Sequence, residues 1–158
     1  MEGYWGIVSG VTCLTITSLG AVLGMGLAAA SAVGAWKKCF LQNKQAPFIL
    51  LALVGFPITQ VLYAMVIMFQ MFGVTTITWP LLILGIFSGF IIGLSAYLQG
   101  WVGASAADSQ AETGQGFTNY IASLGVIETV PIFMFMLTLL AIGKIEVILK
   151  AAATAAGN

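Results

Sequence analysis

Apolar residues fill four long stretches of the chain, and each stretch is interrupted by only a few polar side chains. The stretches are Trp5–Trp36, Pro47–Phe72, Trp79–Ala107 and Gly116–Gly143. A helix needs about 20 apolar residues to cross a hydrocarbon core of about 30 Å. The pattern therefore predicts an all-α membrane protein with four transmembrane helices.

The first and third stretches differ from the second and fourth in residue size. The third places Gly85, Gly89 and Gly93 at four-residue steps, and the first is similarly rich in Gly and Ala. Small residues at this spacing let helix backbones approach closely within lipid. We expect these two helices to form a tight inner layer and the two bulkier helices to lie outside it. Ordinary small-residue packing in an isolated four-helix bundle would give the same pattern.

The chain also resembles a duplication of one helical hairpin. The segment FPITQVLYAMVI of the first hairpin aligns with LGVIETVPIFMF of the second, which sets Gln60 against Glu128. The offset is about 70 residues, as in membrane proteins built from internal repeats. We predict two units, a first hairpin over 1–76 and a second hairpin over 77–158 that carries the carboxylate.

Composition excludes several classes of function. The chain is 60% hydrophobic and 6% charged with no net charge, so a soluble domain and a nucleic-acid partner are not indicated. It contains no His and only two widely separated Cys residues, which excludes a recognisable zinc or redox motif. No phosphate-binding loop pattern is present, so we do not expect the chain to bind ATP by itself.

Charge distribution predicts the orientation in the membrane. Three of the five lysines, Lys37, Lys38 and Lys44, lie in the first connection, which positions this connection in the cytoplasm and both termini outside. The third connection contains Asp108 and Glu112, interpreted as solvated loop residues that could also contact a cytoplasmic partner. The N-terminus lacks a basic region and a cleavage motif, so we interpret it as retained. The sequence leaves open whether the tail 144–158 continues the last helix.

Glu128 is the residue most indicative of function. It lies in the middle of an apolar stretch with no Lys nearby, and the chain has no Arg. An ionised carboxylate at the bilayer centre costs about 2.5–3.5 kcal/mol on insertion scales. Such a residue usually marks the path of an ion or a proton.

Polar residues on two other helices are predicted to lie at the depth of Glu128. Phe56, Thr59, Gln60 and Tyr63 share one helix face by their spacing, and Gln99 is the mid-span amide of the third helix. Gln99 and Glu128 are nearly equidistant from the turn that joins their helices. Two prolines add backbone acceptors, because a helical proline leaves the carbonyl four residues earlier without its donor. These carbonyls are Leu53, released by Pro57, and Ile127, released by Pro131.

The chemistry of this set favours an alkali cation. Hard cations need a shell of oxygen ligands, whereas a proton needs one acceptor. One carboxylate balances one monovalent ion, while a divalent ion would leave a net positive charge. Each polar residue alone could instead be a helix-to-helix hydrogen bond.

At these residues the chain resembles the rotor-ring proteolipid of V-type ATPases, specifically the four-helix K subunit of bacterial sodium-translocating members. The matching segments are Pro57–Tyr63, Ser88-Gly89, Gln99-Gly100 and Glu128-Thr129. The resemblance implies a two-layered homo-oligomeric ring that carries sodium across the cell membrane and is coupled to ATP hydrolysis or synthesis on other subunits. The chain itself would not be an enzyme.

The resemblance also implies roles for single residues. The sodium ligands would be Glu128, Thr59, Gln60, Gln99 and the backbone oxygen of Phe56, and Tyr63 would donate a hydrogen bond to Glu128 and close the site. Phe56 departs from the leucine of the family, which a backbone ligand tolerates. The implied partners are identical subunits in the ring, a stator subunit that supplies an arginine, central-stalk subunits on the cytoplasmic loops, and membrane lipid.

Three other functions fit parts of the pattern. The same ring could carry protons, with Glu128 protonated and the amides acting as helix contacts. A tetraspan scaffold or channel-forming oligomer without energy coupling would tolerate loss of the carboxylate. A small secondary transporter is disfavoured because the spans contain no second charge for substrate recognition.

Overall fold

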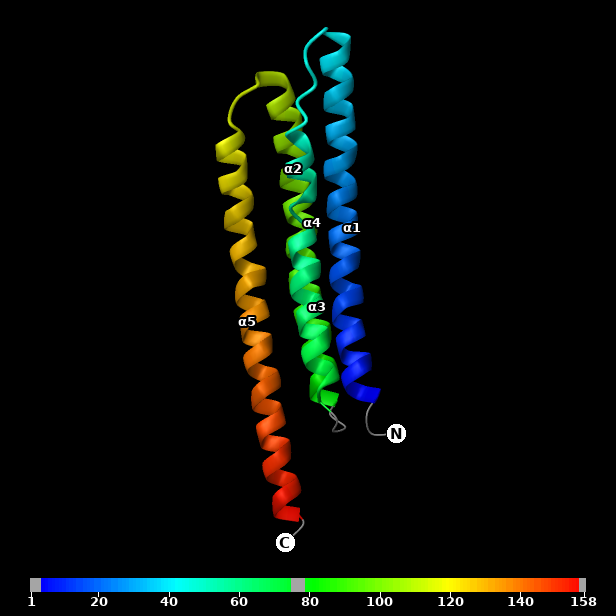
Figure 1. The fold of residues 1–158 in the computed structure, drawn as a ribbon, viewed down its shortest axis with the longest axis vertical. Coiled ribbons are helices and arrows are strands. Elements are labelled where there is room, and N and C mark those ends of the chain that lie inside the picture. Colours follow the sequence, from blue (N-terminus) through cyan, green and yellow to red (C-terminus); the bar gives the residue numbers. More distant parts are fainter. Residues whose placement is uncertain (1–3, 75–78, 157–158) are drawn as a thin grey trace.

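The computed structural model describes residues 4–74 and 79–156, and the regular structure in these ranges is entirely helical. The helices are α1 (Tyr4–Leu41), α2 (Leu50–Gly55), α3 (Ile58–Phe72), α4 (Trp79–Thr113) and α5 (Phe117–Ala156). They run side by side in an elongated bundle, and the start of α1 and the end of α5 lie toward the same end of it (Figure 1). Four helical segments, with α2 and α3 counted together, are long and apolar enough to cross a membrane. The predicted all-α membrane fold is confirmed.

The ends of the helices differ from the predicted ends of the apolar stretches. Helix α1 continues to Leu41, α4 to Thr113 and α5 to Ala156, each beyond the apolar run. Hydropathy marks where a helix leaves the lipid, whereas the helix itself ends where the backbone changes conformation. The turns after α1 and α4 contain positive φ angles, 51° at Asn43 and 67° at Gly114. The second connection falls largely on residues 75–78, outside the described residues.

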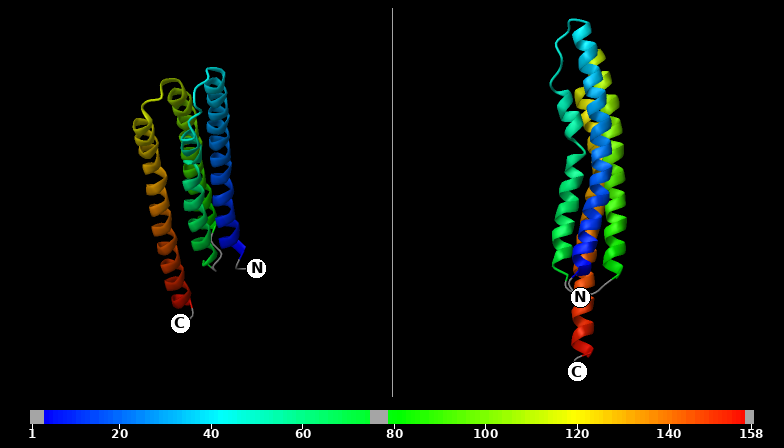
Figure 2. Two further views of the ribbon diagram at one scale, coloured as in Figure 1. Left: turned by 45° about the horizontal axis from the view of Figure 1, so that its top comes forward. Right: turned by 90° about the vertical axis from the view of Figure 1, so that its right-hand side faces the viewer.

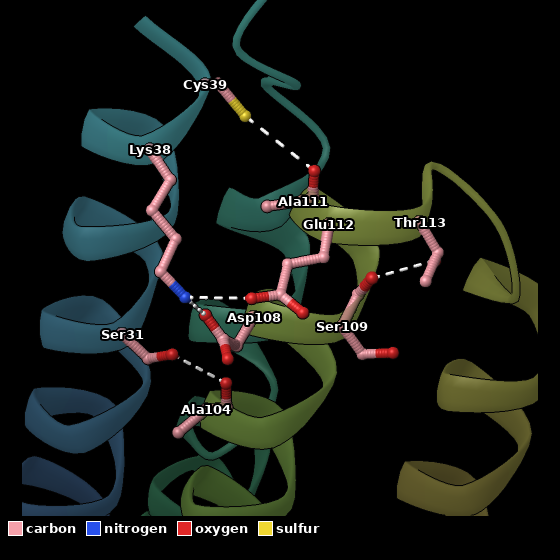
Figure 3. Close-up of polar contacts among 9 residues, drawn as sticks. All are labelled: Ser31, Lys38, Cys39, Ala104, Asp108, Ser109, Ala111, Glu112 and Thr113. Carbon is pink, nitrogen blue, oxygen red and sulfur yellow. Dashed lines mark hydrogen bonds and ion pairs between the residues drawn. The ribbon is translucent and has the colours of Figure 1, made fainter. Parts of the chain in front are cut away.

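The interpretation of Asp108 and Glu112 as loop residues was wrong. Both lie on the last turns of α4, where their four-residue spacing puts them on one helix face. Lys38 of α1 contacts both, with Nζ 2.8 Å from Asp108 Oδ1 and 3.0 Å from Glu112 Oε1 (Figure 3). All three side chains are about half exposed, so the pairs add little stability. They join α1 and α4 at the end of the bundle.

Helices α1 and α4 pack closely through glycines, as the small-residue pattern predicts. A Cβ atom added at Gly100 would overlap the backbone of Gly24, and one added at Gly20 would overlap that of Gly93. The hydroxyl of Thr17 donates across this contact to the carbonyl of Gly89, at 3.3 Å. Backbone contact of this kind is how helices associate in lipid, where apolar burial gives no driving force.

The remaining helices cover this pair on one side. Helix α3 contacts α1 and α4, and α5 contacts α4 and α3. In the left view of Figure 2, α3 and α4 lie between α1 and α5, and in the right view α3 and α4 lie on opposite sides of α1 and α5. Much of α5 is exposed in the single chain, including Val126 at 70% and Phe133 at 69%. The interior between α3, α4 and α5 is where the polar residues predicted from the sequence meet.

Candidate functional site

A break between α2 and α3 brings a backbone carbonyl to the site. Phe56 and Pro57 separate the two helices, and Pro57 has no N–H to continue the helical bonding. The carbonyl of Phe56 accepts from the backbone N–H of Thr59 at 3.3 Å, and the hydroxyl oxygen of Thr59 lies 3.0 Å from the same carbonyl oxygen. The carbonyl of Leu53, released by the proline, faces Gly103 of α4, where a Cβ atom would lie 2.7 Å from its oxygen.

Glu128 of α5 accepts four hydrogen bonds from side chains of α3 and α4. Oε1 accepts from the hydroxyls of Thr59 and Tyr63, each at 2.8 Å. Oε2 accepts from the carboxamide nitrogens of Gln60, at 3.0 Å, and Gln99, at 2.7 Å. The carboxylate thus has hydroxyls on one oxygen and amides on the other. Hydrogen bonds to a charged acceptor are about twice as strong as neutral ones.

The two amides form a buried network behind the carboxylate. Gln60 and Gln99 are fully buried, at 0% exposure. The carboxamide nitrogen of Gln60 also donates to the oxygen of Gln99, at 2.8 Å. The nitrogen of Gln99 also donates to the backbone carbonyl of Leu124, at 3.1 Å. These bonds fix the position of both amides, because an unpaired polar group at this depth would be costly.

Three oxygen atoms surround the hydroxyl of Thr59, which has a single proton to donate. Thr59 Oγ1 lies 2.8 Å from Glu128 Oε1, 3.0 Å from the Phe56 carbonyl oxygen and 3.1 Å from Gln60 Oε1. We call these four atoms the oxygen cluster. A threonine hydroxyl has one proton and can donate to one of its three neighbours. The other close oxygen pairs need a cation or an additional proton to be favourable.

The structure brings together all six residues that the sequence singled out. Glu128 contacts Thr59, Gln60 and Tyr63 directly, and Phe56 contributes its backbone oxygen to the cluster. Gln99 contacts Glu128 through its nitrogen, while its oxygen accepts from Gln60 and so points away from the cluster. Tyr63 is held by the ring of Phe135 of α5, stacked at a centroid separation of 5.3 Å.

One polar contact near the site was missed at the sequence level. The hydroxyl of Ser95, one turn before Gln99 on α4, lies 3.3 Å from the carbonyl oxygen of Ile127. The sequence carried two signals for it. Ser95 shares a helix face with Gln99, and Pro131 leaves the Ile127 carbonyl without its usual donor.

Comparison with known proteins finds one protein family that matches part of the chain. Residues 82–141 match the family model described as the C subunit of ATP synthase. The match lies within the second hairpin and covers less than half of the chain. Members of this family are non-catalytic, ion-carrying parts of the rotor ring in rotary ATPases, where they form homo-oligomeric rings. A search of curated proteins found no significant match.

The extent of the family match agrees with the position of the carboxylate. The matched range includes Gln99 of α4 and Glu128 of α5, whereas the α3 residues of the site lie outside it. The four apolar helices and the family match together indicate a multi-pass membrane protein, whose second hairpin is similar to non-catalytic rotor subunits.

Proposed function

We propose that this chain is the sodium-carrying rotor-ring subunit of a V-type rotary ATPase. The ion would bind at the oxygen cluster, on Glu128, Thr59, Gln60 and the Phe56 carbonyl. The observation that carries the proposal is the excess of acceptors around one hydroxyl, with three oxygens within 3.1 Å of Thr59 Oγ1. A sodium ion among these oxygens replaces the missing hydrogens.

Gln99 is the fifth proposed ligand. Its carboxamide nitrogen lies 2.7 Å from Glu128. Its oxygen would become a ligand only after the carboxamide turns, which gives up the bonds of Gln99 to Gln60 and to the Leu124 carbonyl in exchange for the ion. A shell of oxygens is what an alkali cation requires in place of its water. One carboxylate and one monovalent ion form a neutral site, which lipid tolerates.

The proposed mechanism follows from this neutralisation. With sodium bound, Glu128 carries no net charge and the ring can rotate past lipid. With the site empty, the charged carboxylate is confined to the stator, where an arginine of that subunit pairs with it and displaces the ion. Each charge moved across the membrane is worth about 2.3 kcal/mol per 100 mV, which ATP hydrolysis or synthesis on other subunits would supply or store. Tyr63 would close the site by donating to the carboxylate.

The proposed orientation positions the lysine-rich first connection in the cytoplasm of a cell membrane. The third connection lies at the same end of the bundle (Figure 1). Central-stalk subunits would bind the ring at this end. Identical subunits and lipid would cover the apolar surfaces that are exposed in the single chain.

Carbodiimide labelling of Glu128 tests the choice of ion. Dicyclohexylcarbodiimide modifies protonated carboxyl groups, so bound sodium should protect Glu128 in the purified oligomer at alkaline pH. In Thr59→Val, which removes a half-buried hydroxyl ligand, the sodium concentration needed for half-maximal protection should rise about tenfold. Thr15→Val is the matched control, because its exposed hydroxyl donates to the Val11 carbonyl of its own helix. Labelling that does not change with sodium would indicate a proton-carrying ring.

A further inference from the structure

We infer that Ser95 is a positioning residue for the ion site, acting through the backbone of α5 rather than on the ion. Its hydroxyl donates to the carbonyl of Ile127, the residue immediately before Glu128, at 3.3 Å. Ser95 is 6% exposed and belongs to α4, so the bond joins two helices. The inference rests on the proposed function, because it concerns how tightly the same site holds its ion.

The need for this donor comes from Pro131. In a regular helix the Ile127 carbonyl accepts from the N–H of residue 131, but a proline in this position has no N–H. The proline lies inside α5, which continues through it to Ala156. Within a membrane span, a carbonyl without a donor costs free energy comparable to a lost hydrogen bond, because lipid offers no replacement. Ser95 offers a replacement donor from the neighbouring helix.

The surroundings of this bond contain little else that is polar. Ser95 and Ile127 line a hollow of about 350 Å³ between α4 and α5. The other residues that line it are all apolar: Ile91, Leu94, Leu98, Val126 and Val130. Ser95 is thus the one polar side chain among the described residues of this hollow.

Ser95 and Gln99 bind α5 at two backbone carbonyls that lie about one helical turn apart. Gln99 donates to the carbonyl of Leu124, at 3.1 Å, and Ser95 donates to that of Ile127. The Glu128 side chain begins at the next residue, so these two bonds set the position of its Cα relative to α4. A displacement of about 1 Å is enough to disturb a preorganised site.

The test is a double-mutant cycle on the purified full-length oligomer with sodium-22 binding as the readout. Ser95→Ala should weaken sodium binding about threefold to tenfold, and Ser95→Thr, which retains a hydroxyl, should restore most of it. Ser88→Ala is the control for loss of a buried serine of α4 away from α5: its hydroxyl donates to the Leu84 carbonyl of its own helix, at 2.7 Å, and lies 3.4 Å from Cys13 Sγ of α1. It should bind sodium within about twofold of the wild-type protein.

Pro131→Ala distinguishes positioning from general packing. It returns an N–H to residue 131, which can donate to the Ile127 carbonyl, so Ser95→Ala should have less than a twofold effect in this background. An equal loss in both backgrounds, or wild-type affinity in Ser95→Ala alone, would overturn the inference. Absence of sodium binding to the wild-type oligomer would instead contradict the proposed function. The cycle would then be repeated with the pH dependence of carbodiimide labelling, where unchanged labelling in Ser95→Ala overturns the inference.

Discussion

The site depends on the carboxylate of Glu128. Its four hydrogen-bond donors are all neutral groups, so the carboxylate is the charged group of the site. Two hydroxyls and two amides converge on it from α3 and α4. These donors stabilise a negative charge at mid-membrane without supplying a positive one. A neutral state then requires something that arrives from outside the chain, either a cation or a proton.

Replacing Glu128 by Gln should abolish sodium binding and carbodiimide labelling, because the amide has no charge to balance the ion. We expect the affinity for sodium-22 to fall by more than about 100-fold, because interactions with a charged group are stronger than those with a neutral amide. Glu146→Gln is the matched control, since Glu146 is paired with Lys150 on the exposed part of α5. Retention of binding in Glu128→Gln would support the uncoupled scaffold or channel.

Tyr63→Phe isolates the role of the phenolic hydroxyl. The ring would still stack on Phe135, but the 2.8 Å hydrogen bond to Glu128 Oε1 would be lost. We expect sodium to dissociate about tenfold faster, because a hydrogen bond to a charged group is worth about 1.5–3 kcal/mol, part of which is lost also from the empty site. Stopped-flow exchange of sodium, or the decay of protection against labelling after dilution, measures this rate. A dissociation rate equal to that of the wild-type protein would exclude Tyr63 as the residue that closes the site.

Several features of the site were predictable from the sequence because a helix has a constant rise per residue. Equal distances from a turn predict equal depth, and Gln99 and Glu128 do meet at 2.7 Å. The orientation of the Gln99 carboxamide was not predictable, since it depends on the competing acceptors of Gln60 and Leu124. The end of α4 was also missed, because Gly114 and its positive φ determine it rather than the loss of apolar residues.

At the scale of helices, the glycine contacts between α1 and α4 set the distance between the two. Their small residues were apparent in the sequence, but the register was not, because each glycine could face several partners. The structure pairs Gly100 with Gly24 and Gly20 with Gly93. This register determines the height of Gln99 relative to α1.

Gly100→Ala tests this contact. The new Cβ would overlap the backbone of Gly24, and backbone atoms cannot move aside as a flexible side chain can. We expect a loss of about 1–3 kcal/mol in stability, which is typical of overpacking. Thermal unfolding of the detergent-solubilised oligomer provides the measurement. Gly143→Ala is the control: nothing lies within 4 Å of its added Cβ, so the Tm should stay constant or rise. Equal Tm values for both variants would contradict the close contact.

At the scale of the whole chain, the two hairpins contribute unequal parts to one site. The first provides Thr59, Gln60 and Tyr63 from α3, and the second provides Gln99 and Glu128. Gln60 and Glu128, which the repeat aligns with each other, are hydrogen-bonded at 3.0 Å. The aligned residues therefore do not form two equivalent sites, and each chain of four helices should carry one ion.

This arrangement predicts one sodium ion per chain, measured by equilibrium sodium-22 binding against quantified protein. Gln60→Glu makes the prediction sharper, because it restores a carboxylate to the first hairpin. If the hairpins held separate sites, this variant would bind two ions per chain. In the structure its new carboxylate would instead share the oxygen cluster with Glu128, and two like charges at this distance favour protonation of one of them. We expect the stoichiometry to remain one and sodium binding to become more dependent on pH between neutral and alkaline solution. Gln70→Glu, on an exposed position of α3, is the matched control and should change neither quantity.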